Sequence, residues 1–218
     1  QISWRQGQTD NTNSKSLYSR EGLFPFLLVR HYGRVKGDYY MTIDVHAHYL
    51  SPSLADGLRK RTEAPRIEQL DDGRERYHMP HGTLMLSDAY YDIDARLAYM
   101  DGLGVTRQIL SFPGLFGVDS LPIEDCADLL AGFNDHVAGV AEAHPTRFSG
   151  LAALPLADMD EAVREYRRAR LDLGLVGAIL PVNLLVTEDH AASLAPVFAV
   201  AQELGGHLFV HPGRRPDE

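Results

Sequence analysis

The sequence predicts an α/β fold built on a parallel sheet. Short β-prone runs alternate with amphipathic helical segments from residue 42 to residue 211, the order of elements found in parallel α/β proteins. The β-prone runs are mostly apolar, as expected for strands that helices cover on both faces. The composition is that of a globular domain, because 44 % of the 218 residues are hydrophobic and 23 % are charged.

Five strands are predicted from short apolar runs that end at glycine, proline or polar residues. Consecutive parallel strands need a crossover between them, and helical connections separate all of these runs. The predicted strands cover residues 42–46, 105–111, 147–154, 175–180 and 207–211.

Helices are predicted where apolar residues recur every three or four positions. Ser51 followed by Pro52 is typical of a helix N-terminus, and Gly104 is typical of a helix end. Cys126 lies on the apolar stripe of its helix, which indicates a core residue rather than a nucleophile. In the last helix, four apolar residues are expected to face inward: Leu194, Val197, Phe198 and Ala201. The predicted helices cover residues 51–61, 92–103, 121–143, 158–173 and 189–204.

Residues 63–91 are polar and irregular, with a hairpin expected around Gly73. A connection of this length is unusual in a compact domain unless it has a function. Because it follows the first strand and its short helix, we expect it to lie over the carboxyl ends of the strands. Within it, His78 and His81 are interpreted as surface residues, with a place over the pocket as the alternative.

Two arrangements of such a sheet fit this order of elements: a doubly wound sheet and a TIM-like (β/α)8 barrel. A doubly wound dinucleotide-binding fold would carry a glycine-rich motif after the first strand. His46-Ala47-His48 stands there instead, which favours the barrel. An eight-stranded barrel takes about 250 residues. We therefore expect residues 41–218 to hold only about the first five β/α units and to lack the C-terminal part.

Residues 1–40 differ from the rest of the chain. Residues 1–19 are polar and poor in aliphatic side chains, a composition that favours disorder. The apolar run that ends at Val29 is followed by Arg30-His31-Tyr32 and not by a small-residue cleavage site, which argues against a signal peptide. We interpret residues 1–40 as a disordered or extraneous leader and Met41 as the natural start.

Composition also limits the partners and the compartment. The formal charge is −9 and the basic residues form no stripe, so a nucleic acid is not expected as a partner. No apolar run approaches the roughly 20 residues of a membrane span. Cys126 is the only cysteine, which excludes an intrachain disulfide and fits a cytoplasmic protein. A homo-oligomer is compatible with all of this.

His46 and His48 lie two residues apart at the end of the first strand. Because side chains alternate along a strand, both should point to one side, which in a barrel is the mouth where active sites lie. His211 ends the fifth strand and should emerge at the same mouth. Three imidazoles there can bind one divalent metal ion, with Zn²⁺ as the first candidate. The alternative is three separate strand-end histidines without a ligand.

These histidines lie in stretches that resemble a known family. Ile43-Asp44-Val45-His46-Ala47-His48 followed by Pro52 is similar to the first-strand motif of the amidohydrolase superfamily. Within it, the best match is the amidohydrolase-2 group, which includes amino-carboxymuconate-semialdehyde decarboxylase. Residues 96–111, 133–155 and 208–212 resemble the same group. The resemblance implies that His46, His48 and His211 are metal ligands. It also implies a catalytic histidine and a ligand aspartate that would lie beyond Glu218, so we expect the 218-residue chain alone to be inactive.

The end of the fourth strand bears on the number of metal ions. Dinuclear members of the superfamily bridge two ions with a carboxylated lysine there, but no lysine follows Lys60. One ion is therefore expected. TatD-like nucleases, which also begin with His-x-His, would place a carboxylate near Asn183, and Glu188 is the nearest candidate. Elsewhere, Asp44 is expected as a buried polar group behind the first histidine pair, and His207 as a structural residue.

The resemblance implies decarboxylation of a small unsaturated or aromatic carboxylate by a metal-activated water. A bound divalent ion lowers the pKa of its water to about 7 and polarises a substrate oxygen. Hydrolysis of a lactone, ester or amide by the same water is the alternative, because members of one fold share ligands while their loops set the chemistry. A third hypothesis is an inactive fragment that acts only as an interaction module.

Overall fold

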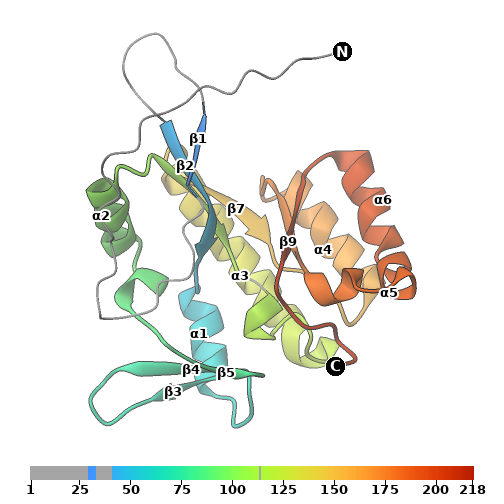
Figure 1. Ribbon diagram of the computed structural model, residues 1–218, viewed down its shortest axis with the longest axis horizontal. Helices are drawn as coiled ribbons and strands as arrows, with labels where there is room; N and C mark the ends of the chain where they lie inside the picture. Colours follow the sequence, from blue (N-terminus) through green and yellow to red (C-terminus); the bar gives the residue numbers. More distant parts are fainter. Residues whose placement is uncertain (1–28, 33–40, 113) are drawn as a thin grey trace, which may run out of the picture.

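A computed structural model describes residues 29–32, 41–112 and 114–218. Its centre is a six-stranded sheet in the order β1-β2-β6-β7-β8-β9 (Figure 1). The last five strands are parallel, and β1 (Val29–Tyr32) pairs antiparallel with β2 at one edge. The five predicted strands are thus confirmed, as part of a (β/α)-barrel. They are β2 (Met41–His48), β6 (Arg107–Ser111), β7 (Phe148–Ala152), β8 (Gly177–Pro181) and β9 (His207–His211).

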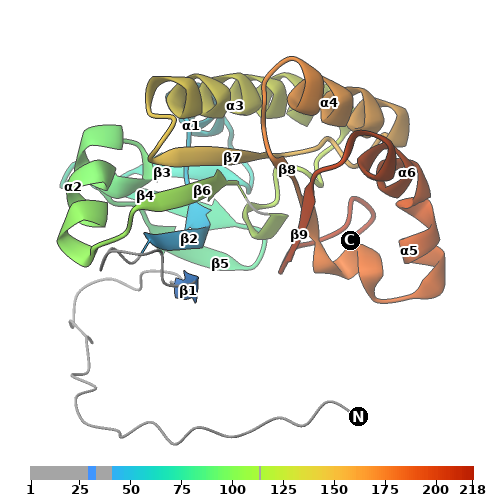
Figure 2. The same ribbon diagram turned by 90° about the horizontal axis from the view of Figure 1, so that it is seen from above.

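Helices follow the strands and cover the sheet, and Figure 2 shows α3 and α4 side by side along one face. Local signals set their ends. Ser51 accepts a hydrogen bond from the Leu54 N–H at 3.3 Å and so caps α1, while Gly104 ends α2 in the left-handed region at φ 67°. The helices are α1 (Pro52–Arg59), α2 (Ile93–Leu103), α3 (Ile123–Ala143), α4 (Met159–Leu171), α5 (Glu188–Ser193) and α6 (Ala195–Leu204).

The prediction of one helix over residues 189–204 was wrong. Two helices, α5 and α6, meet at Leu194, and Pro196 lies in the first turn of α6. Proline has no N–H to continue the ladder of the preceding helix, but its fixed φ suits a new first turn. Of the four residues predicted to face inward, three are buried: Leu194, Val197 and Ala201. Val197 is fully buried, whereas Phe198, predicted to face inward, is 37 % exposed.

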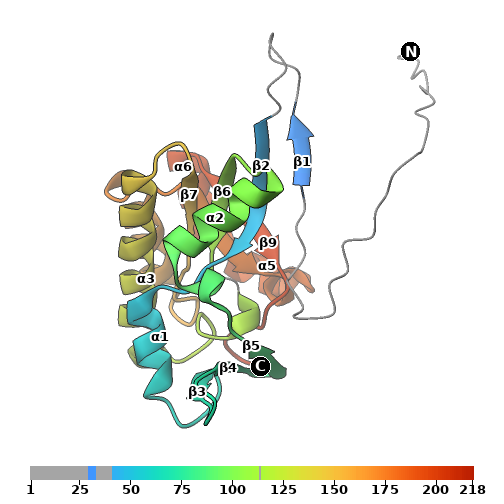
Figure 3. The ribbon, with the colours of Figure 1, turned by 90° about the vertical axis from the view of Figure 1, so that its left-hand side faces the viewer.

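Residues 63–91 form a small sheet of their own. Strands β3 (Arg66–Gln69), β4 (Glu75–Met79) and β5 (Gly82–Met85) pair antiparallel. The β3–β4 turn contains Gly73 at φ 83°, as the hairpin prediction required. Figure 3 shows this sheet beyond the carboxyl end of β2. The Tyr77 hydroxyl donates to the Phe116 carbonyl, in the segment that follows β6, at 3.0 Å. The expected position over the carboxyl ends of the strands is thus confirmed.

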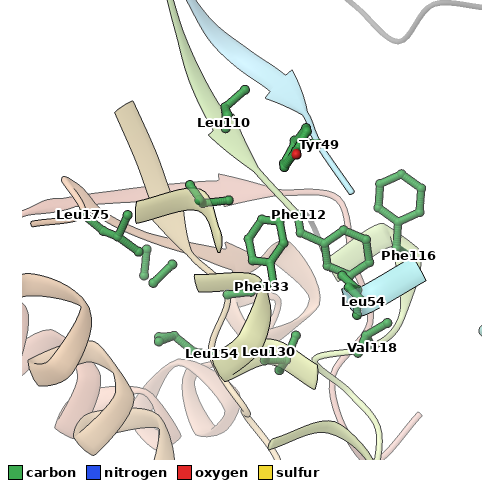
Figure 4. Packing of buried hydrophobic residues seen from close by; sticks show 14 of the residues in the cluster. Tyr49, Leu54, Leu110, Phe112, Phe116, Val118, Leu130, Phe133, Leu154 and Leu175 are labelled. Atoms are coloured by element: carbon green, nitrogen blue, oxygen red, sulfur yellow. The ribbon is translucent and has the colours of Figure 1, made fainter. Parts of the chain in front are cut away.

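The hydrophobic core lies between the sheet and the helices that cover it, with buried side chains from α1, α3, α4 and α6, and Figure 4 shows part of it. The Phe112 and Phe116 rings stack at 4.9 Å, and Phe133 packs against Phe112 at 5.6 Å. Each fully buried Leu or Phe contributes roughly 1.5–3 kcal/mol. Cys126 is fully buried on the inner face of α3, and burial raises the pKa of its thiol to about 12. It is a core residue, as predicted.

The leader predicted at residues 1–40 falls mostly outside the described residues. Of that segment only residues 29–32 are described, as the strand β1. Within the described chain, no helix combines the length and the apolar character that crossing a bilayer requires.

Candidate metal centre

Three imidazoles converge where β2 and β9 end. His46 and His48 come from β2 and His211 from β9. The Nε2 atoms lie 3.0 Å apart between His46 and His48, 3.2 Å between His48 and His211, and 2.8 Å between His211 and His46. His48 and His211 are buried, and His46 is half-buried. Residues 163 positions apart in the sequence thus form one triangle of ring nitrogens.

A β-bulge shapes the end of β2 that carries two of these rings. Asp44 pairs with Gln108 of β6, but the next pair is Ala47 with Leu110, so β2 holds one extra residue. The Asp44 carboxylate accepts a hydrogen bond from the His46 N–H at 3.0 Å. Side-chain alternation on a regular strand predicted that both histidines point to one side. They do converge, but on a strand that is bent between Asp44 and Ala47.

A local hydrogen bond fixes the tautomer of His211. Its Nδ1 lies 2.8 Å from the Pro212 carbonyl, which can only accept. Nδ1 therefore carries the hydrogen, and Nε2 presents its lone pair to the other two rings. Such an interaction of the distal ring nitrogen is typical of histidines that bind metal.

All three histidines are held in the neutral form. Burial lowers the pKa of His48 to about 3, and the neighbouring His211, His46 and Arg96 add to the effect. Burial also lowers the pKa values of His46 and His211. Neutral imidazoles are the form that donates a lone pair to a metal ion.

The arrangement of donor atoms fits a single divalent ion. Nitrogens that each lie about 2.0–2.1 Å from one ion can be no more than about 4.2 Å apart, and all three separations meet this limit. An N–H of His46 or His48 could donate to only one of its two neighbours in the triangle. A cation at the centre would bind all three.

A buried polar chain supports the triangle from behind. Arg96 of α2 donates to the His48 carbonyl at 2.6 Å and to the Gln108 side chain at 3.1 Å. Gln108 in turn donates to Asp44 at 2.9 Å. These three side chains are at most 6 % exposed. Asp44 is a buried polar group, as expected, but the roles of Arg96 and Gln108 were not predicted. The available signal was a charged residue on the inner face of a helix and an amide inside an apolar strand.

A cleft opens beside His211 at the mouth of the sheet, with a volume of about 200 Å³. We call it the mouth cleft. Its lining comes from the β4–β5 turn and from the segments that follow β6, β8 and β9. The lining residues are Met79, Pro80, His81, Leu115, Val182, Asn183, Pro212, Gly213 and Arg214.

The other histidines and the nuclease-type carboxylate lie outside the triangle. His78 bonds to Glu68 at 2.8 Å within the small sheet, and His81 lines the mouth cleft. His207 is exposed at the opposite end of β9. Glu188 is exposed at the start of α5 and, within the described part of the chain, joins no group of potential metal ligands. The TatD-like alternative therefore lacks its carboxylate here.

A sequence profile described as amidohydrolase (the amidohydrolase-2 group) matches residues 43–217. The chain belongs to this family. It is 36 % identical over 182 residues to the 2-amino-3-carboxymuconate-6-semialdehyde decarboxylase of Dictyostelium discoideum, covering 79 % of this chain and 49 % of that protein. It is 40 % identical to the gamma-resorcylate decarboxylase of Rhodococcus jostii (strain RHA1), covering 55 % and 39 %. The chain thus spans about half or less of these relatives.

Solved structures share the fold. The IDCase of Metarhizium anisopliae in its apo form superposes with a TM-score of 0.68 at 19 % identity, covering 79 % of this chain and 50 % of that one. The dihydroxybenzoic acid decarboxylase of Polaromonas sp. JS666, solved with bound manganese and the inhibitor 2-nitroresorcinol, has a TM-score of 0.55 at 23 % identity, covering 79 % and 49 %. At these identities the likeness concerns the fold alone.

Proposed function

We propose that this chain is part of a metal-dependent decarboxylase that acts on a small unsaturated or aromatic carboxylate, with His46, His48 and His211 as the ligands of one divalent ion. The triangle of neutral Nε2 atoms carries the proposal. The decarboxylase relatives at 36 % and 40 % identity support the reaction class. A bound divalent ion supplies Lewis acidity and lowers the pKa of a water that it holds.

The chain's own residues prepare the site for that chemistry. His211 is fixed in one tautomer by the Pro212 carbonyl, and the buried Arg96 holds the His48 carbonyl. The Phe116 and Phe209 rings pack against His48 and His46 at 5.6 and 5.5 Å. These apolar walls limit water around the triangle, which strengthens electrostatic interactions there.

For the metal we propose Zn²⁺, because three imidazole nitrogens suit it. Manganese is the alternative, since the Polaromonas enzyme holds it. Hydrolysis of a lactone, ester or amide uses the same ligands, so the reaction has to be assayed directly. The catalytic acid/base that the family resemblance implies is not assigned to any residue of this chain.

The test is metal analysis and product detection in parallel. The chain, and the polypeptide encoded by the complete reading frame, are dialysed against equimolar zinc and manganese, and bound metal is counted by mass spectrometry. We expect one ion per chain, and loss of metal when His46→Ala is combined with His48→Ala. His207→Ala, a histidine at the other end of β9, is the matched control. Undiminished metal in the double variant would show that the ligand assignment is wrong.

The reaction class is read from the products of the complete polypeptide. We expect release of CO₂ from gamma-resorcylate or a muconate semialdehyde acid, dependent on added metal. Ring opening of a lactone without CO₂ release would favour the hydrolase instead.

A further inference from the structure

The mouth cleft is next to the histidine triangle, because residues that directly follow a triangle histidine in the sequence line it. Pro212 and Gly213, which follow His211, form part of its lining. Val182 and Asn183 follow Pro181, which is the register partner of His211 between β8 and β9. The backbone N–H of Asn183 donates to the Gly213 carbonyl at 3.3 Å, which joins the two sides of the cleft. A ligand in the cleft would thus lie next to the strand end that carries His211.

The walls of the mouth cleft are apolar over most of their extent. Met79, Pro80, Leu115, Val182 and Pro212 supply them. The volume of about 200 Å³ is below the roughly 300–1,000 Å³ of pockets that bind drug-sized ligands. The cleft therefore suits a small, largely apolar body such as a single ring or a short unsaturated chain.

The polar groups at one end of the cleft already hold a carboxylate. The Glu218 side chain accepts a hydrogen bond from the Asn183 amide at 2.7 Å and from the Arg215 N–H at 3.3 Å. The Arg215 guanidinium lies 3.8 Å from the same carboxylate. Donation by Asn183 is the main reason why the pKa of Glu218 lies below its usual range. An anionic carboxylate is thus bound at this place by groups of the chain itself.

Arg214 has a hydrogen-bond donor without an acceptor. Its guanidinium donates to the Glu218 backbone carbonyl, but its Nε is buried without an acceptor. Among the described residues it forms no ion pair with a carboxylate side chain within 4.0 Å. A buried donor without an acceptor is unfavourable, and an anionic ligand at this place would supply the acceptor.

We propose that the mouth cleft is a carboxylate-binding subsite, in which a small aromatic or unsaturated carboxylate binds the Asn183 amide and the Arg214 guanidinium in place of Glu218. Its apolar body lies against Met79, Leu115 and Val182. The identification of this ligand as the substrate of the metal centre rests on the proposed function. The binding of a carboxylate in the cleft is independent of the proposed function, because none of the three histidines takes part in it.

Benzoate is the probe and phenol the uncharged comparison, with binding measured by calorimetry on the full chain, both metal-depleted and zinc-loaded. Benzoate should bind and phenol should bind more weakly. Arg214→Gln should weaken benzoate binding about tenfold or more, because a hydrogen bond to a charged group is lost. Asn183→Asp should weaken it as well, because it places a like charge beside the ligand. Arg164→Gln on the exposed face of α4 is the control.

Glu218→Gln should change the affinity for benzoate in the opposite direction. It removes the competing internal carboxylate, so benzoate should bind about two- to fivefold more tightly, the range expected for an exposed ion pair. Circular dichroism establishes whether each variant is folded. If Arg214→Gln does not fold, Asn183→Asp still tests the subsite, because Asn183 is partly exposed and its substitution should be tolerated.

Equal binding of benzoate to the wild type and all three cleft variants, or equal binding of benzoate and phenol, would overturn the subsite. Measurements on the metal-depleted protein distinguish a failure of the subsite from a failure of the proposed function. Dependence on Arg214 without metal supports the subsite even if the histidine assignment is wrong. Stoichiometric zinc with no effect of the cleft variants overturns the subsite alone.

Discussion

At the scale of single residues, the triangle depends on side chains that never touch its centre. Arg96, Gln108 and Asp44 form one buried chain that ends on the backbone of both β2 histidines. Gln108 is the middle of this chain, since its carbonyl accepts from Arg96 and its amide donates to Asp44. A single amide therefore links two buried charged groups, each of which also bonds to the backbone of a β2 histidine.

Gln108→Leu tests this chain. It keeps the approximate volume but removes one hydrogen-bond partner from each of the buried side chains Arg96 and Asp44, so we expect a loss of about 1–3 kcal/mol in the free energy of unfolding. Metal affinity should fall by about 10- to 100-fold, as for other groups that orient ligands. Urea unfolding of the metal-depleted chain and zinc titration measure the two effects. The matched control is Gln69→Leu at the exposed end of β3, and equal effects in both variants would contradict the role of Gln108.

Asp119 is a second residue whose burial sets its behaviour. It lies in the loop between β6 and α3, is 3 % exposed, and its Oδ1 has no hydrogen-bond partner. Burial raises the pKa of its carboxyl to about 7, although its own N–H and that of Ser120 oppose the shift. The carboxyl is thus protonated in the folded chain at a pH where an unfolded chain would have ionised it.

This difference predicts a pH dependence with a defined sign. Between about pH 4 and pH 7 the folded state holds a proton at Asp119 that the unfolded state has lost, so the contribution of Asp119 to stability falls as the pH rises. The full loss is about 4 kcal/mol. Asp119→Asn should remove it and raise the melting temperature most at pH 7 and above. Thermal melts at several pH values measure the melting temperature, and Asp128→Asn on the exposed face of α3 is the control. Equal pH profiles of the Asp119 variant and the wild type would contradict the role of Asp119.

At the scale of elements, the contact between β8 and β9 places His211. Gly177 opens β8 opposite His207, and a Cβ added at Gly177 would lie 1.8 Å from the His207 carbonyl oxygen. Backbone occupies this space, so the two strands approach as closely as they do only because residue 177 has no side chain.

Gly177→Ala should therefore separate β9 from β8. We expect a loss of about 3 kcal/mol in the free energy of unfolding, at the upper end for overpacking, and weaker zinc binding because His211 moves with β9. Gly139→Ala in α3 is the control, because nothing lies within 4 Å of the added Cβ there. That variant should be neutral or more stable by up to about 1 kcal/mol. An alanine at 177 that leaves both stability and zinc binding unchanged would refute the argument.

Across the whole molecule, what the sequence could predict was local in origin. Strand ends, caps and apolar periodicity need only neighbouring residues, so the order of elements and the meeting of His46, His48 and His211 followed from them. The bulge in β2 did not, because it is defined by pairing with β6, more than 60 residues away. The roles of Arg96 and Gln108 were missed for the same reason, since their partners come from other elements.

The open edge of the sheet at β9 also concerns the whole molecule. Within the described residues, β9 pairs with β8 alone and forms one end of the strand order. Its second edge thus presents backbone donors and acceptors that another strand can bind. Val210, the fourth residue of β9, is 44 % exposed. We expect such an edge with an apolar side chain to favour association between chains.

The 218-residue chain should therefore self-associate at micromolar concentration, and Val210→Lys should reduce this. A charged side chain on an edge strand opposes edge-to-edge pairing because its burial in a continued sheet would cost desolvation energy. Sedimentation velocity over a concentration series measures the association. Val186→Lys is the matched control, because Val186 is 69 % exposed but lies in the loop before α5. If both lysine variants reduce association equally, net charge controls it and the β9 edge is not the site of association.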